Sequence, residues 1–271
     1  RNAEIAQPPA SVPPARPGAQ MRTPGKLSRG EEILEYLQRE AEGLGEEFLG
    51  TGILKMYNAG SVTLEELKSF YNIYIKDEKV NNKDKNGLRM IIFAIHNDLY
   101  DVIEFLLNVP GIDITGSTSI DNPLLFSVMQ DKLEMVQYLL DLKNEDGTYK
   151  IDVNFMDDKK TPIIFYGFMR YDQTGDDEIL KTLLKRADIE INLSNDEGNT
   201  PLHVLCKIAV GNQFYEPIKI INILIEKGAN KRVKNKNGLQ PRDIIIGYIR
   251  SDVITDELRI KLISILKILD L

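Results

Sequence analysis

The sequence is poor in the residues from which many active sites are built. It has one cysteine, Cys206, and two histidines, His96 and His203, among 271 residues. A single thiol excludes an intramolecular disulfide framework and any multi-cysteine metal site. We therefore expect a reducing, intracellular compartment such as the cytoplasm. The scarcity of His and Cys also favours protein classes that do not depend on their chemistry.

An excess of positive charge and a long apolar run are missing as well. The chain has 34 Lys and Arg against 41 Asp and Glu, a net charge of −7 and a pI near 5.1. Because binding to a phosphate backbone needs a basic surface, we predict no nucleic-acid partner. No apolar stretch approaches the roughly 18 residues that indicate a membrane span, so we also predict no membrane insertion.

Common motifs of enzymes are absent too. The chain has no phosphate-binding Gly-x-x-x-x-Gly-Lys-Ser/Thr loop and no His-Glu-x-x-His zinc motif. Cys206 follows His203 by three residues, which places both on one helix face, but nothing nearby supplies an oxyanion site or orients the ring. We interpret Cys206 as a small buried thiol. We predict no catalytic residue, no cofactor and no metal.

The character of the chain changes near residue 50. Residues 1–27 contain six of the twelve prolines and predict a disordered, Pro-rich arm. Residues 28–43 predict an amphipathic helix that begins with a capping box, Ser28 with Glu31. A helix this short is not stable alone, so we expect it to pack on another part of the molecule. Residues 1–50 carry five Arg and one Lys, whereas the remainder is rich in Lys, Asn and Ile. The segment 28–50 is therefore either an appended or fused piece or a tail that diverged from the domain.

From residue 82 onward the chain repeats itself. Prolines that open apolar helices recur at spacings of 39, 39 and 40, and a weaker copy lies upstream, at Gly87. Each copy continues into a second apolar helix. A fixed period of this length is typical of a solenoid of stacked helix pairs. The four aligned prolines are Pro123, Pro162, Pro201 and Pro241.

The fourth copy resembles the ankyrin repeat in three stretches, Asn-Thr-Pro-Leu-His at 199–203, Ile-Leu-Ile-Glu-Lys-Gly-Ala-Asn at 223–230 and Asn-Gly-Leu-Gln-Pro at 237–241. The resemblance implies an all-α ankyrin-repeat solenoid of helix-turn-helix units with short β-hairpin-like turns. It also implies that the His203 ring bonds the backbone of the neighbouring repeat. The predicted units are a capping helix pair at 51–81 and about five repeats at 82–116, 117–155, 156–194, 195–234 and 235–271.

Stacked helix pairs present a long concave surface, to which hairpin tips and the ends of first helices contribute. We therefore predict a non-enzymatic module that binds a protein partner through this groove. We interpret two segments, 170–177 and 209–217, as loops that are longer than those of a usual repeat. Their aromatic residues either anchor a partner or pack over the ends of the helices. The predicted partner contacts are Met129, Gln130, Asp157, Asp158, Lys160, Phe168, Met169, Tyr171, Asp196, Glu197, Asn199, Lys207, Phe214, Tyr215, Lys236 and Leu239.

Several interpretations stay open. The Lys-, Asn- and Ile-rich repeats resemble those of bacterial effectors or viral ankyrin proteins, which act in a host cytoplasm. In a second interpretation the chain is a two-partner adaptor whose helix 28–43 recruits another protein. In a third, it is the binding part of an enzyme whose catalytic domain is absent here.

The last helix, predicted over 256–270, has a compact apolar sector that we expect to face the preceding repeat. Ile260, Ile263 and Ile268 fall among its polar positions and should be partly exposed. Three such residues on one terminal helix indicate a chain that continues past Leu271, or a surface for a partner or for self-association.

Overall fold

The computed structural model describes residues 27–40, 48–116, 118, 120–211, 216–250 and 254–270. Helices packed in pairs make up the described chain, and its β structure consists of two isolated bridges, Lys143 with Tyr149 and Met156 with Pro162. The predicted all-α fold is confirmed. The chain separates into two compact units, residues 1–114 and 115–271, which we call the N-terminal and C-terminal units. Except for Leu27, the arm predicted over residues 1–27 lies outside the described residues.

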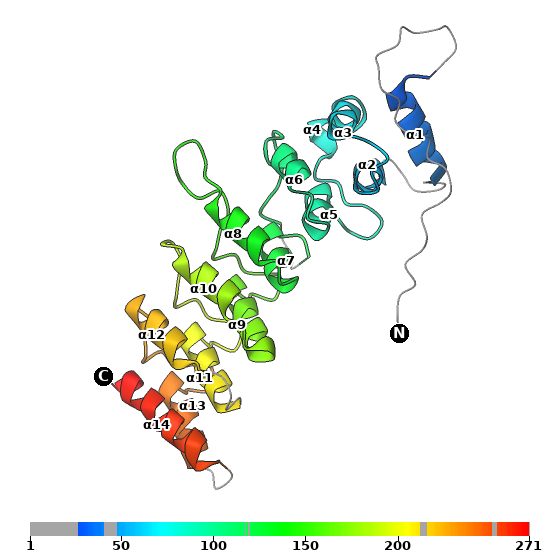
Figure 1. The fold of residues 1–271 in the computed structure, drawn as a ribbon. Coiled ribbons are helices and arrows are strands. Elements are labelled where there is room, and N and C mark those ends of the chain that lie inside the picture. Colours follow the sequence, from blue (N-terminus) through cyan, green and yellow to red (C-terminus); the bar gives the residue numbers. More distant parts are fainter. Residues whose placement is uncertain are drawn as a thin grey trace. The chain divides into compact units, whose positions relative to one another are not determined.

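The N-terminal unit begins with the predicted amphipathic helix, which packs on its neighbours. Ser28 N–H donates to Glu31 Oε2 at 2.6 Å, as a capping box requires. Ile33 and Leu37 are buried, and Arg29 Nε donates to Glu66 Oε1 at 3.0 Å. The helices of this unit are α1 (Arg29–Glu40), α2 (Phe48–Asn58), α3 (Leu64–Phe70), the π-helical turn η1 (Tyr71–Ile75), α4 (Lys76–Lys79), α5 (Met90–His96) and α6 (Tyr100–Leu107) (Figure 1).

The helices α2 and α3 form a tightly packed pair. Ile53 and Leu54 on α2 and Leu67 on α3 are fully buried. Gly50 lets α2 approach α5, because a Cβ at this residue would lie 2.8 Å from Met90 Cγ. The sequence pattern missed the π-helical turn that extends α3 as far as Lys76, whose φ of +58° ends it.

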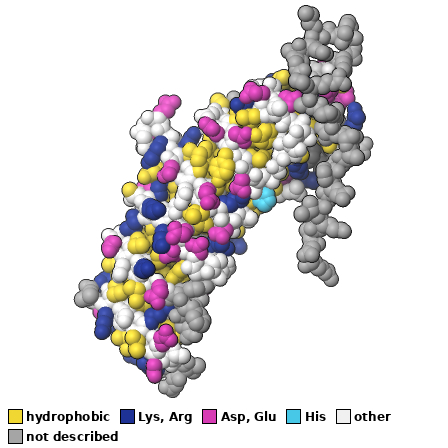
Figure 2. Space-filling model, viewed as in Figure 1, with side chains coloured by type: hydrophobic (Ala, Val, Ile, Leu, Met, Phe, Trp, Pro, Cys, Tyr) yellow, Lys and Arg dark blue, Asp and Glu magenta, His cyan; other side chains and the backbone are white. Residues whose placement is uncertain are grey.

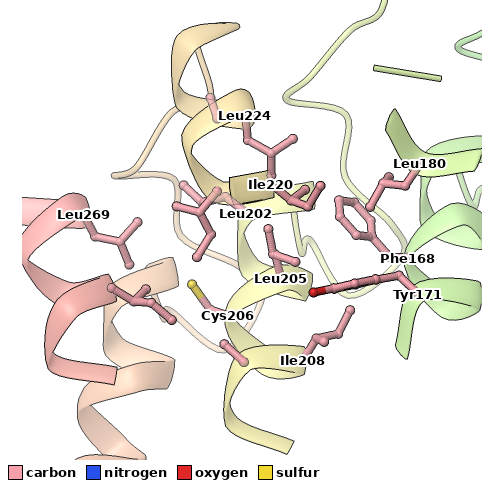
Figure 3. Packing of buried hydrophobic residues seen from close by; sticks show 14 of the residues in the cluster. Phe168, Tyr171, Leu180, Leu202, Leu205, Cys206, Ile208, Ile220, Leu224 and Leu269 are labelled. Atoms are coloured by element: carbon pink, nitrogen blue, oxygen red, sulfur yellow. The ribbon is translucent and has the colours of Figure 1, made fainter. Parts of the chain in front are cut away.

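The C-terminal unit stacks four helix pairs. Each first helix packs on the next, α7 on α9, α9 on α11 and α11 on α13, while α8 packs on α10 (Figure 1). A continuous apolar core runs between the rows from α9 to α14 (Figure 3). The helices are α7 (Pro123–Met129), α8 (Leu133–Asp141), α9 (Ile163–Thr174), α10 (Glu178–Lys185), α11 (Pro201–Gly211), α12 (Ile218–Glu226), α13 (Pro241–Ile249) and α14 (Asp256–Asp270).

The turns before the first helices share one hydrogen-bonding device. Asn195 Oδ1 accepts the N–H groups of Glu197 and Asn199, both at 3.0 Å. The side chains of Asp84, Asp157 and Asn235 likewise accept the backbone N–H groups of the residues two and four positions further along the chain. Such side chains mimic a backbone turn. In each case the residue three positions further on has a positive φ, at Gly87, Lys160, Gly198 and Gly238.

Asparagines also join successive copies. Asn154 Nδ2 donates to Asp188 O at 2.8 Å, and Asn154 Oδ1 accepts Glu190 N–H at 2.7 Å. Asn192 makes the equivalent pair of bonds to Gly228 and Asn230. Each asparagine therefore fixes the loop that lies one repeat downstream.

Candidate partner-binding surface

His203 has a structural role. Its Nδ1 accepts the Thr200 N–H at 3.2 Å, and its Nε2 lies 2.9 Å from the carbonyl oxygen of Leu239 in the next copy. Because an N–H only donates and a carbonyl only accepts, the ring is neutral with its proton on Nε2. Burial lowers the pKa of His203, and the bond to Leu239 opposes that shift only in part. The predicted bond to the neighbouring repeat is confirmed.

Cys206 is an inert core residue. Its side chain is fully buried on α11, and burial raises the pKa of its thiol far above the ordinary value. In Figure 3 its sulfur points toward the side of Leu269, away from α9. A thiol in this setting is not a nucleophile. The interpretation of Cys206 as a small buried thiol is confirmed.

The third copy is out of register with the proline alignment. Pro201 is the first residue of α11, whereas Pro162 is the N-cap of α9 and Ile163 begins the helix. The cause is the preceding turn, since Pro162 follows its turn residue Asp157 by five positions and Pro201 follows Asn195 by six. Every residue of α9 is thereby one position nearer the start of the helix than the prolines predict.

The predicted exposure of Phe168 and Tyr171 is therefore wrong. Phe168 is fully buried and Tyr171 is 3% exposed, and both belong to the apolar core. Figure 3 shows Tyr171 pointing from α9 toward Leu205 and Ile208 of α11, and Phe168 pointing toward Ile220 of α12. The one-residue shift gives Met169, which is 52% exposed, the surface position that the alignment assigned to Phe168.

Two further predicted contacts are buried in the turns. Asp157 is 5% exposed, and its Oδ2 accepts the Tyr166 hydroxyl at 2.6 Å, which together with burial raises the pKa of Tyr166. Asn199 is 1% exposed, and its Oδ1 accepts from Asn235 Nδ2 at 2.8 Å. These polar side chains hold the turns together and are not available to a partner, so the prediction that they face the groove is wrong.

The first of the two predicted loops, 170–177, is largely helical. Helix α9 continues to Thr174, and in the second predicted loop, 209–217, α11 continues to Gly211. Phe214 and Tyr215 lie outside the described residues. The additional length of the second copy lies instead in residues 143–150, a short hairpin after α8 in which Lys143 bridges to Tyr149. The proline alignment missed this hairpin, although Asp146-Gly147 is a strong hairpin signal.

The remaining predicted contacts are exposed. Met129, Met169 and Lys207 are each the seventh residue of their helices, and they recur on the neighbouring helices α7, α9 and α11. The two methionines are 38% and 52% exposed. We call these three positions the first-helix surface. The other exposed residues from the predicted set are Gln130, Asp158, Lys160, Asp196, Glu197, Lys236 and Leu239.

Ion pairs border the first-helix surface. Arg170 Nη2 contacts Asp131 Oδ2, a link between the third and second copies that the sequence did not reveal. Arg170 Nε is buried and has no hydrogen-bond partner among the described residues. Lys207 Nζ lies 3.1 Å from Glu197 Oε2. On the face drawn in Figure 2, acidic and basic side chains are interspersed over the described residues.

The terminal helix α14 bears the isoleucines as predicted. Ile260 is 67% exposed and Ile263 is 39% exposed, whereas Ile268 is half-buried against the core. The opposite sector, which includes Leu262 and Ile265, is fully buried. The partial exposure is confirmed, and self-association through these residues stays a prediction.

Across the described ranges, no helix is both long and apolar enough to cross a membrane. Those same residues include no group of three or more His, Cys, Asp or Glu side chains arranged to hold a metal ion.

Comparison with known proteins agrees with this fold. Residues 197–236 match the family described as Ankyrin repeat. The chain is 26% identical over 166 residues to the putative ankyrin repeat protein YahD of Escherichia coli (strain K12), covering 61% of this chain and 76% of that protein. It is similar to the crystal structure of EF0377, an ankyrin repeat protein, with a TM-score of 0.51, 23% identity and coverage of 74% and 91%. The chain is an ankyrin-repeat protein.

A further relative is much longer than this chain. Over 145 residues the chain is 28% identical to alpha-latrocrustotoxin-Lt1a of Latrodectus tredecimguttatus, which covers 53% of this chain but 9% of the toxin. The match is thus confined to a small part of the toxin. Ankyrin repeats are typically protein-binding and non-catalytic.

Proposed function

We propose that this chain is a non-enzymatic module that binds a partner protein through the first-helix surface and the adjacent hairpin tips. The observation that carries the proposal is the recurrence of exposed methionines, Met129 and Met169, at the same position of two helices that pack on each other. Methionine is flexible and polarisable, and it is over-represented on surfaces that bind other proteins.

The surroundings of the methionines suit a protein interface. Interfaces place apolar side chains at the centre and polar groups at the rim. Here the rim consists of the pair Arg170–Asp131 and the pair Lys207–Glu197. Each pair leaves hydrogen-bonding capacity for a partner at the edge of the apolar centre. This distribution supports protein binding more than the binding of a small ligand, which favours an enclosed pocket.

The adaptor interpretation receives less support. Helix α1 uses its apolar stripe within the N-terminal unit, where Ile33 and Leu37 are each 2% exposed. Its Arg29 is also engaged, with Glu66 and with the carbonyl oxygen of Ser61 at 3.1 Å. A helix whose apolar face is covered has only its polar face for a second partner. Recruitment through residues 28–43 stays a prediction.

Affinity capture with a matched pair of variants tests the proposed function. The test variant is Met129→Glu with Met169→Glu, which places charge on the apolar centre without touching the core. The control is Ile73→Glu, because Ile73 is 57% exposed on η1 and outside this surface. We expect mass spectrometry to find proteins retained by the wild-type chain and the control but lost from the double variant. Identical sets of captured proteins for all three chains would contradict the proposal.

A further inference from the structure

A cavity of about 250 Å³ opens between the last turns of α8 and α10, on the second helices of the C-terminal unit. Leu140 contributes an apolar wall, and Tyr149 of the hairpin 143–150 closes one side. The first-helix surface lies on α7, α9 and α11, so this cavity is a separate feature. Its volume is below the roughly 300–1,000 Å³ of pockets for drug-sized ligands, which limits an occupant to a small molecule.

The wall of the cavity is rigidly built. The Tyr149 ring lies between Lys143 Nζ, 2.8 Å from its centroid, and the guanidinium carbon of Arg186 at 3.4 Å. Arg186 is 4% exposed and lines the cavity. Its nitrogens donate to the carbonyl oxygens of Leu140 and Ile151, both at 3.0 Å, and to both carboxylate oxygens of Asp188. These bonds fix the hairpin, and with it the cavity, in one geometry.

Two polar groups in the wall have unused hydrogen-bonding capacity. Thr182 is 7% exposed and lines the cavity, yet its hydroxyl has no hydrogen bond within the described part of the chain. Arg186 has five N–H donors. Its bonds use four of them, and the one left on Nη1 has no partner among the described residues. Both groups line the cavity and can therefore form a hydrogen bond to an occupant.

Two side chains of opposite charge line the cavity, and they form no ion pair with each other. Asp141 and Lys185 both belong to the lining, and neither forms an ion pair with a described residue. Asp141 is the last residue of α8, where the negative end of the helix dipole adds to the attraction for a cation. Lys185 and Arg186 are consecutive residues that both line the cavity, and together they attract an anion.

From this arrangement we propose that the cavity binds a small zwitterion of the free α-amino-acid class. The ammonium group lies toward Asp141 and the carboxylate toward Lys185 and the Arg186 Nη1–H. The Thr182 hydroxyl forms a hydrogen bond to the part of the ligand that lies between its ammonium and carboxylate groups. A ligand with only one of these charges leaves the opposite wall unpaired, so we expect both to be required.

Thermal unfolding of the full chain with the twenty natural amino acids tests the proposal, and L-alanine has the sharpest controls. Propionate lacks the ammonium group of alanine, and ethylammonium lacks its carboxylate. At ten times the dissociation constant, a bound amino acid should raise the Tm by about 3 °C. We expect no rise with either single-charge probe at matched ionic strength.

Variants locate the site. Asp141→Asn and Lys185→Gln change exposed side chains, so the fold should persist, and each should weaken amino-acid binding at least about tenfold. Thr182→Val keeps the side-chain volume and tests the hydroxyl independently. Glu145→Gln and Lys267→Gln make the same charge changes on exposed residues away from the lining and should leave binding unchanged.

Three results would overturn the proposal. The first is that none of the amino acids shifts the Tm or perturbs the amide signals of α8 and α10 in NMR titrations. The second is that propionate binds as tightly as alanine, which would reveal an anion site only. The third is binding that survives both Asp141→Asn and Lys185→Gln, which would place the ligand elsewhere.

Discussion

The third and fourth copies build the same helix pair from different interactions. In the fourth copy, the third residue of the first helix is His203, and its ring joins Thr200 to Leu239. In the third copy the same position is occupied by Phe165, whose ring packs edge-on against Phe168 at 6.3 Å. The His203 ring joins the fourth copy to the fifth, whereas the contact between Phe165 and Phe168 lies within α9. The same helix position therefore carries a link between copies in the fourth copy and a contact within its own helix in the third.

The largest expected effect tests the aromatic side of this comparison. Phe168→Ala should lower the free energy of unfolding by about 3–5 kcal/mol, because it leaves a cavity in a fully buried part of the core. Met169→Ala should change it by less than about 0.5 kcal/mol, because half of that side chain is already in water. Urea unfolding of both variants measures the difference. A larger loss for Met169→Ala would refute the register of α9.

A smaller effect tests the His203 link between copies through pH. The pKa of His203 is lowered in the folded chain, whereas in the unfolded chain it has its ordinary value near 6.5. Below about pH 6.5 the unfolded state therefore binds more protons, and the free energy of unfolding falls as the pH is lowered toward 5. His203→Gln should cost about 1 kcal/mol at pH 7.5 and flatten this dependence. Equal slopes for the variant and the wild type would contradict a neutral, buried ring.

The smallest effect concerns the turns that precede the two copies. Lys160 has a φ of +56° where the fourth copy has Gly198 at +73°. A side chain in this conformation is strained by about 1–2 kcal/mol. Replacement by glycine relieves this strain, but it also increases the conformational entropy of the unfolded chain, which offsets part of the stabilisation. Lys160→Gly should therefore raise the free energy of unfolding by up to about 1 kcal/mol in thermal or urea unfolding. A destabilised variant would show that Lys160 makes compensating contacts.

Much of the fold was predictable from local pattern. Apolar periodicity located the helices, the box of Ser28 with Glu31 located the start of α1, and the motif around His203 gave its bond to the next copy. The register of α9 was not predictable in this way. Pro162 looks like the first residue of a helix, and only the length of the turn from Asp157 shows that it is the N-cap.

The candidate surface was less predictable than the fold. Met129 and Met169 were among the predicted contacts, but so were Phe168 and Asn199, which are buried. A sequence motif gives the approximate side of a helix, and an error of one residue turns a side chain by about 100°. The hairpin 143–150 and the cavity beside it depend on a contact between Tyr149 and the distant Arg186, which no local pattern contains.

The asparagine links between copies have a direction. The side chain always belongs to the upstream copy and the bonded backbone to the downstream one, as with Asn154 and the loop at 188–190. When an upstream copy melts, the next loop loses the template that shapes it, whereas melting downstream frees only a side-chain amide that water readily solvates. Through the asparagine links, the melting of a copy therefore affects its successor more than its predecessor, whereas the bonds from Arg186 to Leu140 and Ile151 act in the opposite direction.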